Sequence, residues 1–182
     1  MPNVFLIGPM GSGKTTVGKR LARLLGLDFY DCDQELEQLT GASISLIFDI
    51  EGEKGFRERE TQLLRQLTSG NGRLLATGGG VVCSAENRRL LSSRGTVVYL
   101  KTSVSNQLRR LSQDKNRPLL QTPDREQRLN ELALERNALY ASLADLTFVT
   151  GEQSIHAASR ALARAISDYL DPLKNSENTH AG

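Results

Sequence analysis

The stretch VFLIGPMGSGKTT, Val4–Thr16, decides the fold class. Its first four residues are apolar and predict a buried strand, and residues 8–15 fit the pattern G-x-x-x-x-G-K-[ST]. A segment with helical periodicity follows Lys14 and completes a strand–loop–helix unit, the setting in which this pattern binds phosphate. An accidental glycine-rich turn is the alternative, and the flanking strand and helix disfavour it.

Each part of this loop suits a nucleoside triphosphate. Glycines let successive backbone N–H groups turn inward toward phosphate oxygens, and the helix that begins near Lys14 directs its positive end to the same place. Lys14 adds a full charge toward the β- and γ-phosphates, and Thr15 offers a hydroxyl to Mg²⁺. The loop therefore predicts triphosphate binding, but it does not specify the reaction.

Short apolar runs and longer helical segments alternate along the rest of the chain. We predict further strands at 27–30, 74–76, 96–100 and 146–149, and helices at about 14–25, 33–69 in pieces, 84–94, 103–112, 125–143 and 154–170. This alternation is typical of an α/β fold, in which helices cover both faces of a parallel sheet.

Length and composition limit the possible classes. The 182 residues suit one domain over residues 1–172, followed by a flexible polar tail over 173–182. The net charge of +2 is too small to indicate nucleic acid or a membrane surface as a partner. No apolar run approaches the roughly 18 residues of a membrane span, and a strand-like run starts almost at once, so we expect no signal peptide and a cytoplasmic protein.

The cysteines and histidines show no metal-ligand spacing. Cys32 and Cys83 lie far apart in the sequence, so a reduced pair is expected, with a disulfide as the open alternative. His156 and His180 are isolated, and we expect both on the surface. One loop, at about 112–124, is polar, rich in proline signals and long for an α/β unit, which favours a mobile lid.

Two carboxylates close the second predicted strand in the sequence Asp31-Cys32-Asp33. Alternation along a strand would place Asp31 and Asp33 on the same side, facing the phosphate loop. One could hold Mg²⁺ through a water, and the other could accept a proton from an attacking hydroxyl. The alternative is that Asp33 only caps the helix that follows.

Two arginines are candidates for binding an anion. Arg136 interrupts the apolar stripe of the helix at 125–143, so it faces inward unless its head reaches past the stripe to water. Arg57 precedes Glu60 by three residues, a spacing that suits either a held guanidinium or an ordinary surface ion pair. Two inward arginines could bind a carboxylate with forked geometry.

The stretch ATGGGVV, residues 76–82, follows a predicted strand with three consecutive glycines, Gly78 to Gly80. A bare backbone there allows a ring to approach closely, although a flexible turn is the alternative. Together with Asp33 and the two arginines, this run suits a small, hydroxylated, anionic acceptor.

The ordered set GPMGSGKTT, D-C-D, F-R-E-R-E, T-G-G-G, N-R-P-L-L and E-R-N-A-L-Y resembles the shikimate kinase family from about Asn3 to Tyr169. The resemblance implies a three-layer αβα fold like that of nucleoside monophosphate kinases, with a five-stranded parallel sheet in the order 2-3-1-4-5, a P-loop and a mobile lid. It also implies Mg²⁺-dependent transfer of the ATP γ-phosphoryl group to the 3-hydroxyl of shikimate, giving shikimate 3-phosphate in chorismate and aromatic amino-acid biosynthesis.

The resemblance assigns roles residue by residue. It implies ATP contacts at Gly11, Ser12, Gly13, Lys14, Thr15, Thr16, Arg110, Arg117 and Gln153, with Arg117 as the lid arginine. Thr15 would hold the metal directly and Asp31 through a water. Acceptor contacts would come from the region at about 33–60 and beyond, namely from Asp33, Phe48, Phe56, Arg57, Glu60, Gly78, Gly79, Gly80 and Arg136. Asp33 would be the catalytic base, assisted by Lys14 and Arg117.

We expect a monomer whose partners are ATP and shikimate. A kinase for another small polyol acid, such as gluconate, shares the phosphate loop and differs in its acceptor pocket. A regulatory ATPase that docks to a partner would instead hydrolyse ATP without any acceptor.

Overall fold

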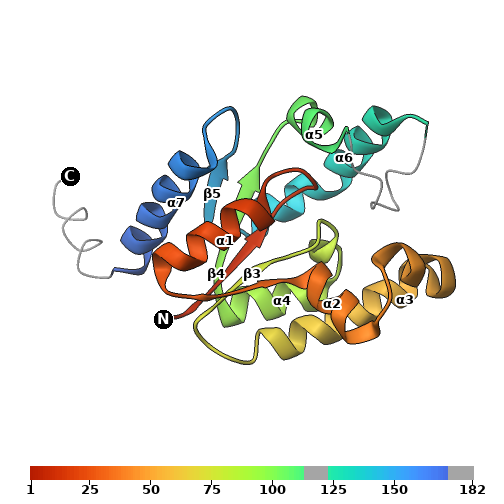
Figure 1. The fold of residues 1–182 in the computed structure, drawn as a ribbon, viewed down its shortest axis with the longest axis horizontal. Helices are drawn as coiled ribbons and strands as arrows, with labels where there is room; N and C mark the ends of the chain where they lie inside the picture. The colour runs from red at the N-terminus through yellow and green to blue at the C-terminus, as the bar shows by residue number, and fades with distance from the viewer. Residues whose placement is uncertain (113–122, 172–182) are drawn as a thin grey trace.

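The computed structural model describes residues 1–112 and 123–171, and Figure 1 shows a central sheet between two groups of helices. The strands are β1 (Asn3–Ile7), β2 (Asp28–Asp31), β3 (Arg73–Ala76), β4 (Gly95–Lys101) and β5 (Leu146–Val149). All five predicted strands are confirmed, and β2 begins one residue later than expected.

The helices follow the predicted pattern, with differences at the ends. They are α1 (Lys14–Leu25), α2 (Cys32–Thr40), α3 (Ile44–Leu67), α4 (Ala85–Arg94), α5 (Val104–Leu111), α6 (Arg125–Leu143) and α7 (Ile155–Leu170), with a short 3₁₀ turn η1 (Val81–Cys83). The segment predicted as helix in pieces divides into α2 and α3 because Gly41 adopts a left-handed conformation, at φ 68°, that ends α2.

The sheet confirms the expected fold class. Its order is β2-β3-β1-β4-β5, and every neighbouring pair is parallel. β1 lies in the middle, hydrogen-bonded to β3 and β4 on its two sides, and all of its residues are buried. This burial explains why Val4–Ile7 is a continuous apolar run rather than an alternating one.

Helices cover both faces of the sheet, because successive strand side chains point in opposite directions. Val4 and Leu6 face α1 and α7, which lie side by side in Figure 1, in a core that includes Val17, Leu21, Leu74, Val98, Leu162 and Ile166. Phe5 and Ile7 face α3, α4 and α6, in a core that includes Leu63, Leu64, Leu75, Leu91, Val97 and Tyr140.

The topology brings three loops together at one edge of the sheet. The parallel strands β1, β2 and β3 end at the same edge, so the phosphate loop, the D-C-D sequence and the glycine run at 78–80 all leave the sheet there. The candidate functional residues therefore meet although they are far apart in the sequence.

Both cysteines are free, so the disulfide alternative is excluded, and His156 is exposed beside Arg20. The predicted lid at 112–124 falls largely on 113–122, outside the described residues, and the predicted tail at 173–182 and His180 also lie outside them. Within residues 1–112 and 123–171, no helix combines the length and apolarity needed to cross a membrane.

Packing of α1 against the sheet depends on Gly18. A Cβ atom at this position would lie 2.8 Å from the Phe29 ring and 3.2 Å from a Leu6 methyl group. We predict that Gly18→Val lowers the free energy of unfolding by about 1–3 kcal/mol through overpacking. Urea denaturation measures the change.

Lys19→Val is the matched control, because Lys19 is exposed on the same helix and its replacement changes no sheet contact. We expect it to alter stability by no more than about 0.5 kcal/mol. Equal losses in the two variants would show that close packing at Gly18 is not the cause.

Candidate functional site

A cleft of about 520 Å³ opens at the edge of the sheet where β1, β2 and β3 end. Most residues predicted for the site line it: Gly11, Gly13, Lys14, Thr15, Thr16, Asp31, Asp33, Phe48, Phe56, Arg57, Glu60, Gly78, Gly79, Gly80, Arg110 and Arg136. The predicted ATP and acceptor contacts therefore share one continuous cavity.

Three glycines give the phosphate loop its shape. Gly8, Gly11 and Gly13 have φ angles of 143°, 73° and 90°, which side chains of L-residues rarely permit. A Cβ at Gly8 would also lie 2.5 Å from the Leu100 carbonyl oxygen of β4. The loop can therefore adopt this path only with glycine at these positions.

The N-terminus of α1 differs from every other α-helix in the described part of the chain. Its N-cap is Gly13, and no side chain accepts a hydrogen bond from its first turn. The other α-helices are capped by Asp31, Ser43, Ser84, Ser103, Asp124 and Ser154. Backbone N–H groups at a helix N-terminus need an acceptor, so the start of α1 suits an anion such as phosphate.

Two cationic side chains lie along this loop. Lys14 Nζ donates to the carbonyl oxygens of Gly8 and Pro9, at 2.6 and 2.9 Å. Arg110 of α5 donates to the carbonyls of Gly11 and Gly151, at 2.8 and 3.1 Å. Both cations therefore lie against the phosphate loop.

The two aspartates both line the cleft, but their places in the fold differ from the sequence prediction. Asp31 is the last residue of β2 and caps α2, since its Oδ1 accepts from the backbone N–H groups of Asp33 and Gln34, at 3.0 and 3.1 Å. Asp33 lies in the first turn of α2, so the prediction that strand alternation aligns the pair was wrong. The capping role suggested for Asp33 belongs to Asp31.

Asp31 also faces the phosphate loop. Thr15 Oγ1 donates to Asp31 Oδ2 at 2.5 Å, which places a hydroxyl and a carboxylate oxygen side by side next to the start of α1. Mg²⁺ prefers such oxygen ligands and commonly shares them with phosphate and water. This donor set fits a magnesium ion.

The glycine run at 78–80 leaves room for charged side chains of the cleft itself. A Cβ at Gly78 would lie 2.9 Å from Glu60 Oε2 and 3.3 Å from Asp33 Oδ1, and one at Gly80 would lie 2.5 Å from the Arg57 guanidinium carbon. A Cβ at Gly79 would lie 3.5 Å from Arg136 Nη1, which is an ordinary contact distance. A flexible turn is thus an inadequate explanation, because the bare backbone at Gly78 and Gly80 makes space for the side chains of Glu60 and Arg57.

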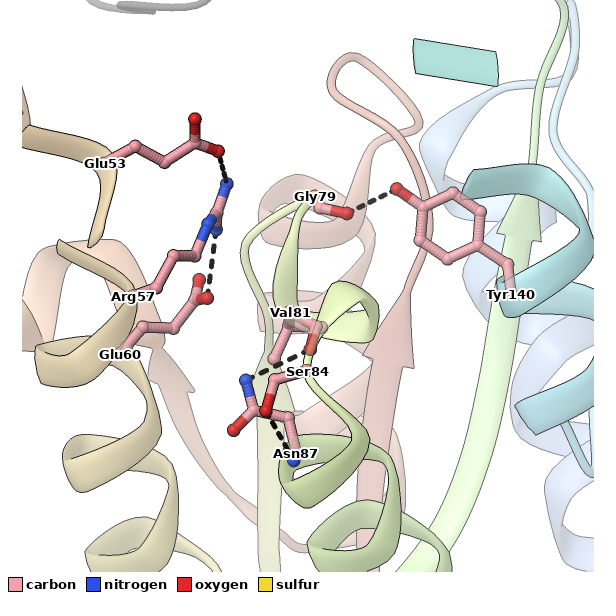
Figure 2. Close-up of polar contacts among 8 residues, drawn as sticks. All are labelled: Glu53, Arg57, Glu60, Gly79, Val81, Ser84, Asn87 and Tyr140. Carbon is pink, nitrogen blue, oxygen red and sulfur yellow. Dashed lines mark hydrogen bonds and ion pairs between the residues drawn. The ribbon is translucent and has the colours of Figure 1, made fainter. Parts of the chain in front are cut away.

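Arg57 is held by two carboxylates, as Figure 2 shows. Its Nη1 lies 3.0 Å from Glu60 Oε1 and its Nη2 lies 3.5 Å from Glu53 Oε1. Burial tends to lower the pKa of Arg57, but the Glu60 charge and hydrogen bond outweigh it and raise that pKa. Glu60 is only 5% exposed, so the alternative of an ordinary surface ion pair was wrong.

Glu60 itself shows the cost of this burial. Burial raises the pKa of its carboxyl. The charge of Arg57, and to a smaller extent that of Arg136, lowers this pKa, but the effect of burial is larger. The carboxylate is therefore held between cations that only partly compensate for the loss of water.

Arg136 confirms the inward orientation predicted from its apolar stripe. The residue is 5% exposed, and its Nε is buried without a hydrogen-bond partner among the described residues. The alternative in which its head reaches past the stripe to water was wrong. A buried guanidinium with unused donor capacity is suited to an anionic ligand.

Tyr140 is a site residue whose role the sequence reasoning missed. Its hydroxyl donates to the Gly79 carbonyl at 2.5 Å, and its ring stacks on Tyr99 with centroids 5.1 Å apart. Burial raises its pKa, so it remains a neutral donor. Its position four residues after Arg136, on the same helix face, is the signal that could have identified it.

The far end of the glycine run is also anchored. Asn87 Nδ2 donates to the Val81 carbonyl at 3.1 Å, and Ser84 Oγ accepts from the Asn87 backbone N–H at 3.3 Å (Figure 2). Asn87 is 1% exposed. Side chains from α4 and α6 therefore fix the bare backbone on both sides.

An apolar wall faces these charges. The rings of Phe48 and Phe56 lie 4.7 Å apart, and the Arg57 guanidinium lies 5.1 Å above the Phe56 ring. Ile44 joins this wall and was not predicted, although its spacing of four residues from Phe48 indicates the same helix face. Met10, Gln34, Glu37, Thr77 and Leu111 also line the cleft without having been predicted.

Two predicted ATP contacts in the described part of the chain do not line the cleft. Ser12 is 1% exposed within the loop and does not line the cavity. Gln153 bonds instead to its own segment, with Oε1 accepting from the Gly151 N–H at 3.1 Å. Arg117 lies outside the described residues.

Comparison with known proteins agrees with this geometry. A family model described as Shikimate kinase matches residues 10–167. The shikimate kinase of Histophilus somni (strain 2336) is 50% identical over 173 residues, which cover 94% of this chain and 97% of that relative.

Solved structures give the same result. The shikimate kinase from Acinetobacter baumannii in complex with shikimate superposes with a TM-score of 0.87 at 50% identity, covering 93% of each chain. The shikimate kinase from Aquifex aeolicus superposes with a TM-score of 0.79 at 34% identity, covering 92% of this chain and 97% of that one. Since both the family model and these relatives span nearly the whole sequence, the chain belongs to the shikimate kinase family.

Proposed function

We propose that this protein transfers the γ-phosphoryl group of ATP to the 3-hydroxyl of shikimate and so forms shikimate 3-phosphate. The observation that carries the proposal is the convergence of Arg57, Arg136 and Asp33 on the bare backbone at 78–80, in the same cleft as the phosphate loop. Two guanidinium groups match a carboxylate, and an aspartate matches a hydroxyl.

ADP release with a panel of acceptors tests this function. We expect rapid release with shikimate, much slower release with gluconate and other hydroxy acids, and very little without an acceptor. Preference for gluconate would make the protein a different polyol-acid kinase. Equal release without any acceptor would make it an ATPase.

On the donor side, the chain binds and orients the triphosphate. Backbone N–H groups of residues 11–16 and the start of α1 hold the β- and γ-phosphates, and Lys14 lies beside them. Thr15 would hold Mg²⁺ directly and Asp31 through a water. The ion, when bound, offsets negative charge on the phosphates. Arg110 and Gln153 would lie by the adenine, an assignment that rests on the resemblance.

On the acceptor side, the chain supplies orientation and a proton acceptor. Arg57 and Arg136 bind the carboxylate, while Phe48 and Phe56 pack against the ring. Asp33 accepts a hydrogen bond from the acceptor hydroxyl and takes its proton. Phosphoryl transfer depends mainly on alignment and charge stabilisation, which these contacts provide.

Three further assignments extend the proposal. Arg117, from the predicted lid, reaches the transferring phosphate. The protein acts as a monomer and works in the cytoplasm. Size-exclusion chromatography with light scattering checks the oligomeric state.

Asp33→Asn tests the proton acceptor. The amide keeps the shape of the carboxylate but is a far poorer base, so we predict a loss of about 10²–10⁴ in kcat, with ATP affinity largely retained. Steady-state kinetics and calorimetric ATP titration measure the two quantities. Glu35→Gln removes a charge from the same helical turn, outside the cleft, and is the control. Near-normal turnover in Asp33→Asn would remove it from the mechanism.

Arg136→Met tests the carboxylate contact. Removing one member of a buried charge pair costs about 2–5 kcal/mol, so we expect the KM for shikimate to rise by about 30-fold or more while the KM for ATP changes little. The control is Arg128→Met, a half-buried position on the same helix that pairs with Glu131 and does not line the cleft. An unchanged KM for shikimate would show that Arg136 does not bind the acceptor.

Glu60→Gln tests how the buried carboxyl that pairs with Arg57 affects stability as the pH changes. Because the pKa of Glu60 is raised in the fold, the folded chain binds this proton more tightly than the unfolded chain does. The resulting stabilisation is fully present below pH 4.5, the ordinary value, and is lost as the pH rises through the folded pKa. The difference in unfolding free energy between the parent protein and the variant should therefore fall as pH rises.

Denaturant titrations of both proteins between pH 4 and 8 measure that difference. Groups other than Glu60 titrate in both proteins, so their contributions cancel to first order. A difference that grows with pH would mean that the fold lowers the Glu60 pKa, contrary to this account.

A further inference from the structure

Helix α3 is interrupted at Gly52. Gly52 has φ 71° and ψ −178°, which is non-helical and essentially accessible only to glycine. A Cβ built there would meet no atom within 4 Å. Glycine is therefore needed here for its backbone angles rather than for space, and α3 consists of two helical segments, 44–51 and 53–67.

The two segments carry different parts of the acceptor end of the cleft. Ile44 and Phe48 lie on the first segment, and Phe56, Arg57 and Glu60 lie on the second. The angle at Gly52 therefore determines how far the outer part of the apolar wall stands from the guanidinium of Arg57.

Contacts across the break hold this angle on two sides. On the cleft side, the rings of Phe48 and Phe56 lie 4.7 Å apart. On the exposed side, Glu51 reaches past two helical turns to Arg59 and accepts two hydrogen bonds, at 2.7 Å from Nε and 2.6 Å from Nη2.

The path of Glu51 requires a second glycine. A Cβ at Gly55 would lie 2.5 Å from the Cβ of Glu51 and 3.1 Å from its Oε2. Gly55 thus leaves room for the ion pair, just as Gly52 provides the bend that the ion pair spans. Together, these contacts form one local arrangement on the outer surface of α3, made by Glu51, Gly52, Gly55 and Arg59.

We propose that the Glu51–Arg59 pair is a clasp that fixes the bend at Gly52, so that both are positioning residues for the acceptor site. The proposal rests on the proposed function, because it concerns affinity for shikimate. Exposed ion pairs add little to stability, but a bidentate contact between a guanidinium and a carboxylate restricts the relative position of the two side chains. Breaking the clasp therefore alters acceptor binding more than folding.

Kinetics of Glu51→Gln, Arg59→Met and Gly55→Ala test the clasp. If the bend is correct in only a fraction of molecules, the apparent affinity falls by that fraction. We expect the KM for shikimate to rise about threefold to tenfold in all three variants, with kcat and the KM for ATP nearly unchanged. The double variant Glu51→Arg/Arg59→Glu should recover part of the loss.

Arg65→Met is the matched control. Arg65 lies on the same helix and makes an exposed pair with Glu86, whose Oε1 lies 2.6 Å from Nε and 2.5 Å from Nη2, but this pair spans no break. Its removal should leave both KM values unchanged. Gly55→Ala introduces a good helix former, so thermal melting should find that variant folded.

The outcomes separate the two proposals. A parent protein that does not phosphorylate shikimate overturns the proposed function itself. An active parent with an unchanged KM for shikimate in Glu51→Gln and Arg59→Met overturns the clasp alone. An equal rise in Arg65→Met, or an equal rise in the KM for ATP, also overturns it, because the effect would then not be specific to the bend.

Discussion

The absence of side chains at residues 78–80 is the constraint on which the rest of the site depends. Charged groups from α2, α3 and α6 crowd the backbone here. Glu60 at Gly78 and Arg57 at Gly80 approach more closely than a Cβ would permit, while Asp33 at Gly78 and Arg136 at Gly79 would lie in contact with one. These groups come from distant parts of the sequence and share one cleft only because parallel strands end at the same edge. Glycine thus serves the site by making room for the protein's own side chains, and the acceptor then meets the surface that they form.

Bringing these charges together has an electrostatic cost that the fold only partly offsets. Glu60 stabilises Arg57, yet burial still raises the pKa of that carboxyl. Arg136 is almost fully buried, and its Nε has no partner among the described residues. The hydroxyl of Tyr140 and the amide of Asn87 hold the adjacent backbone in place. An acceptor carboxylate between Arg57 and Arg136 would supply the missing negative charge, which explains how a stable fold can also be a good receptor for an anion.

Much of this arrangement was predictable from residue patterns. The strands and most helices follow from apolar periodicity, and the inward position of Arg136 follows from the interruption of a helical stripe. The sequence could not show which aspartate caps α2, because Asp31 and Asp33 both suit a helix N-terminus. In addition, β2 ends one residue later than the sequence pattern predicts. The bend at Gly52 left no signal either, since one glycine among charged residues looks the same in a straight helix and in a broken one. Tyr140 resembled an ordinary core residue because its hydroxyl contact is with a loop 61 residues earlier.

The two guanidinium groups at the glycine run are proposed to recognise the acceptor through its negative charge. Isothermal titration calorimetry with shikimate and with its carboxamide analogue tests this claim most directly, because the two ligands differ only in that charge. We expect the carboxamide to bind about 100-fold more weakly or worse, because the buried guanidinium groups would lose their charged partner. Equal affinity for the two ligands would contradict it.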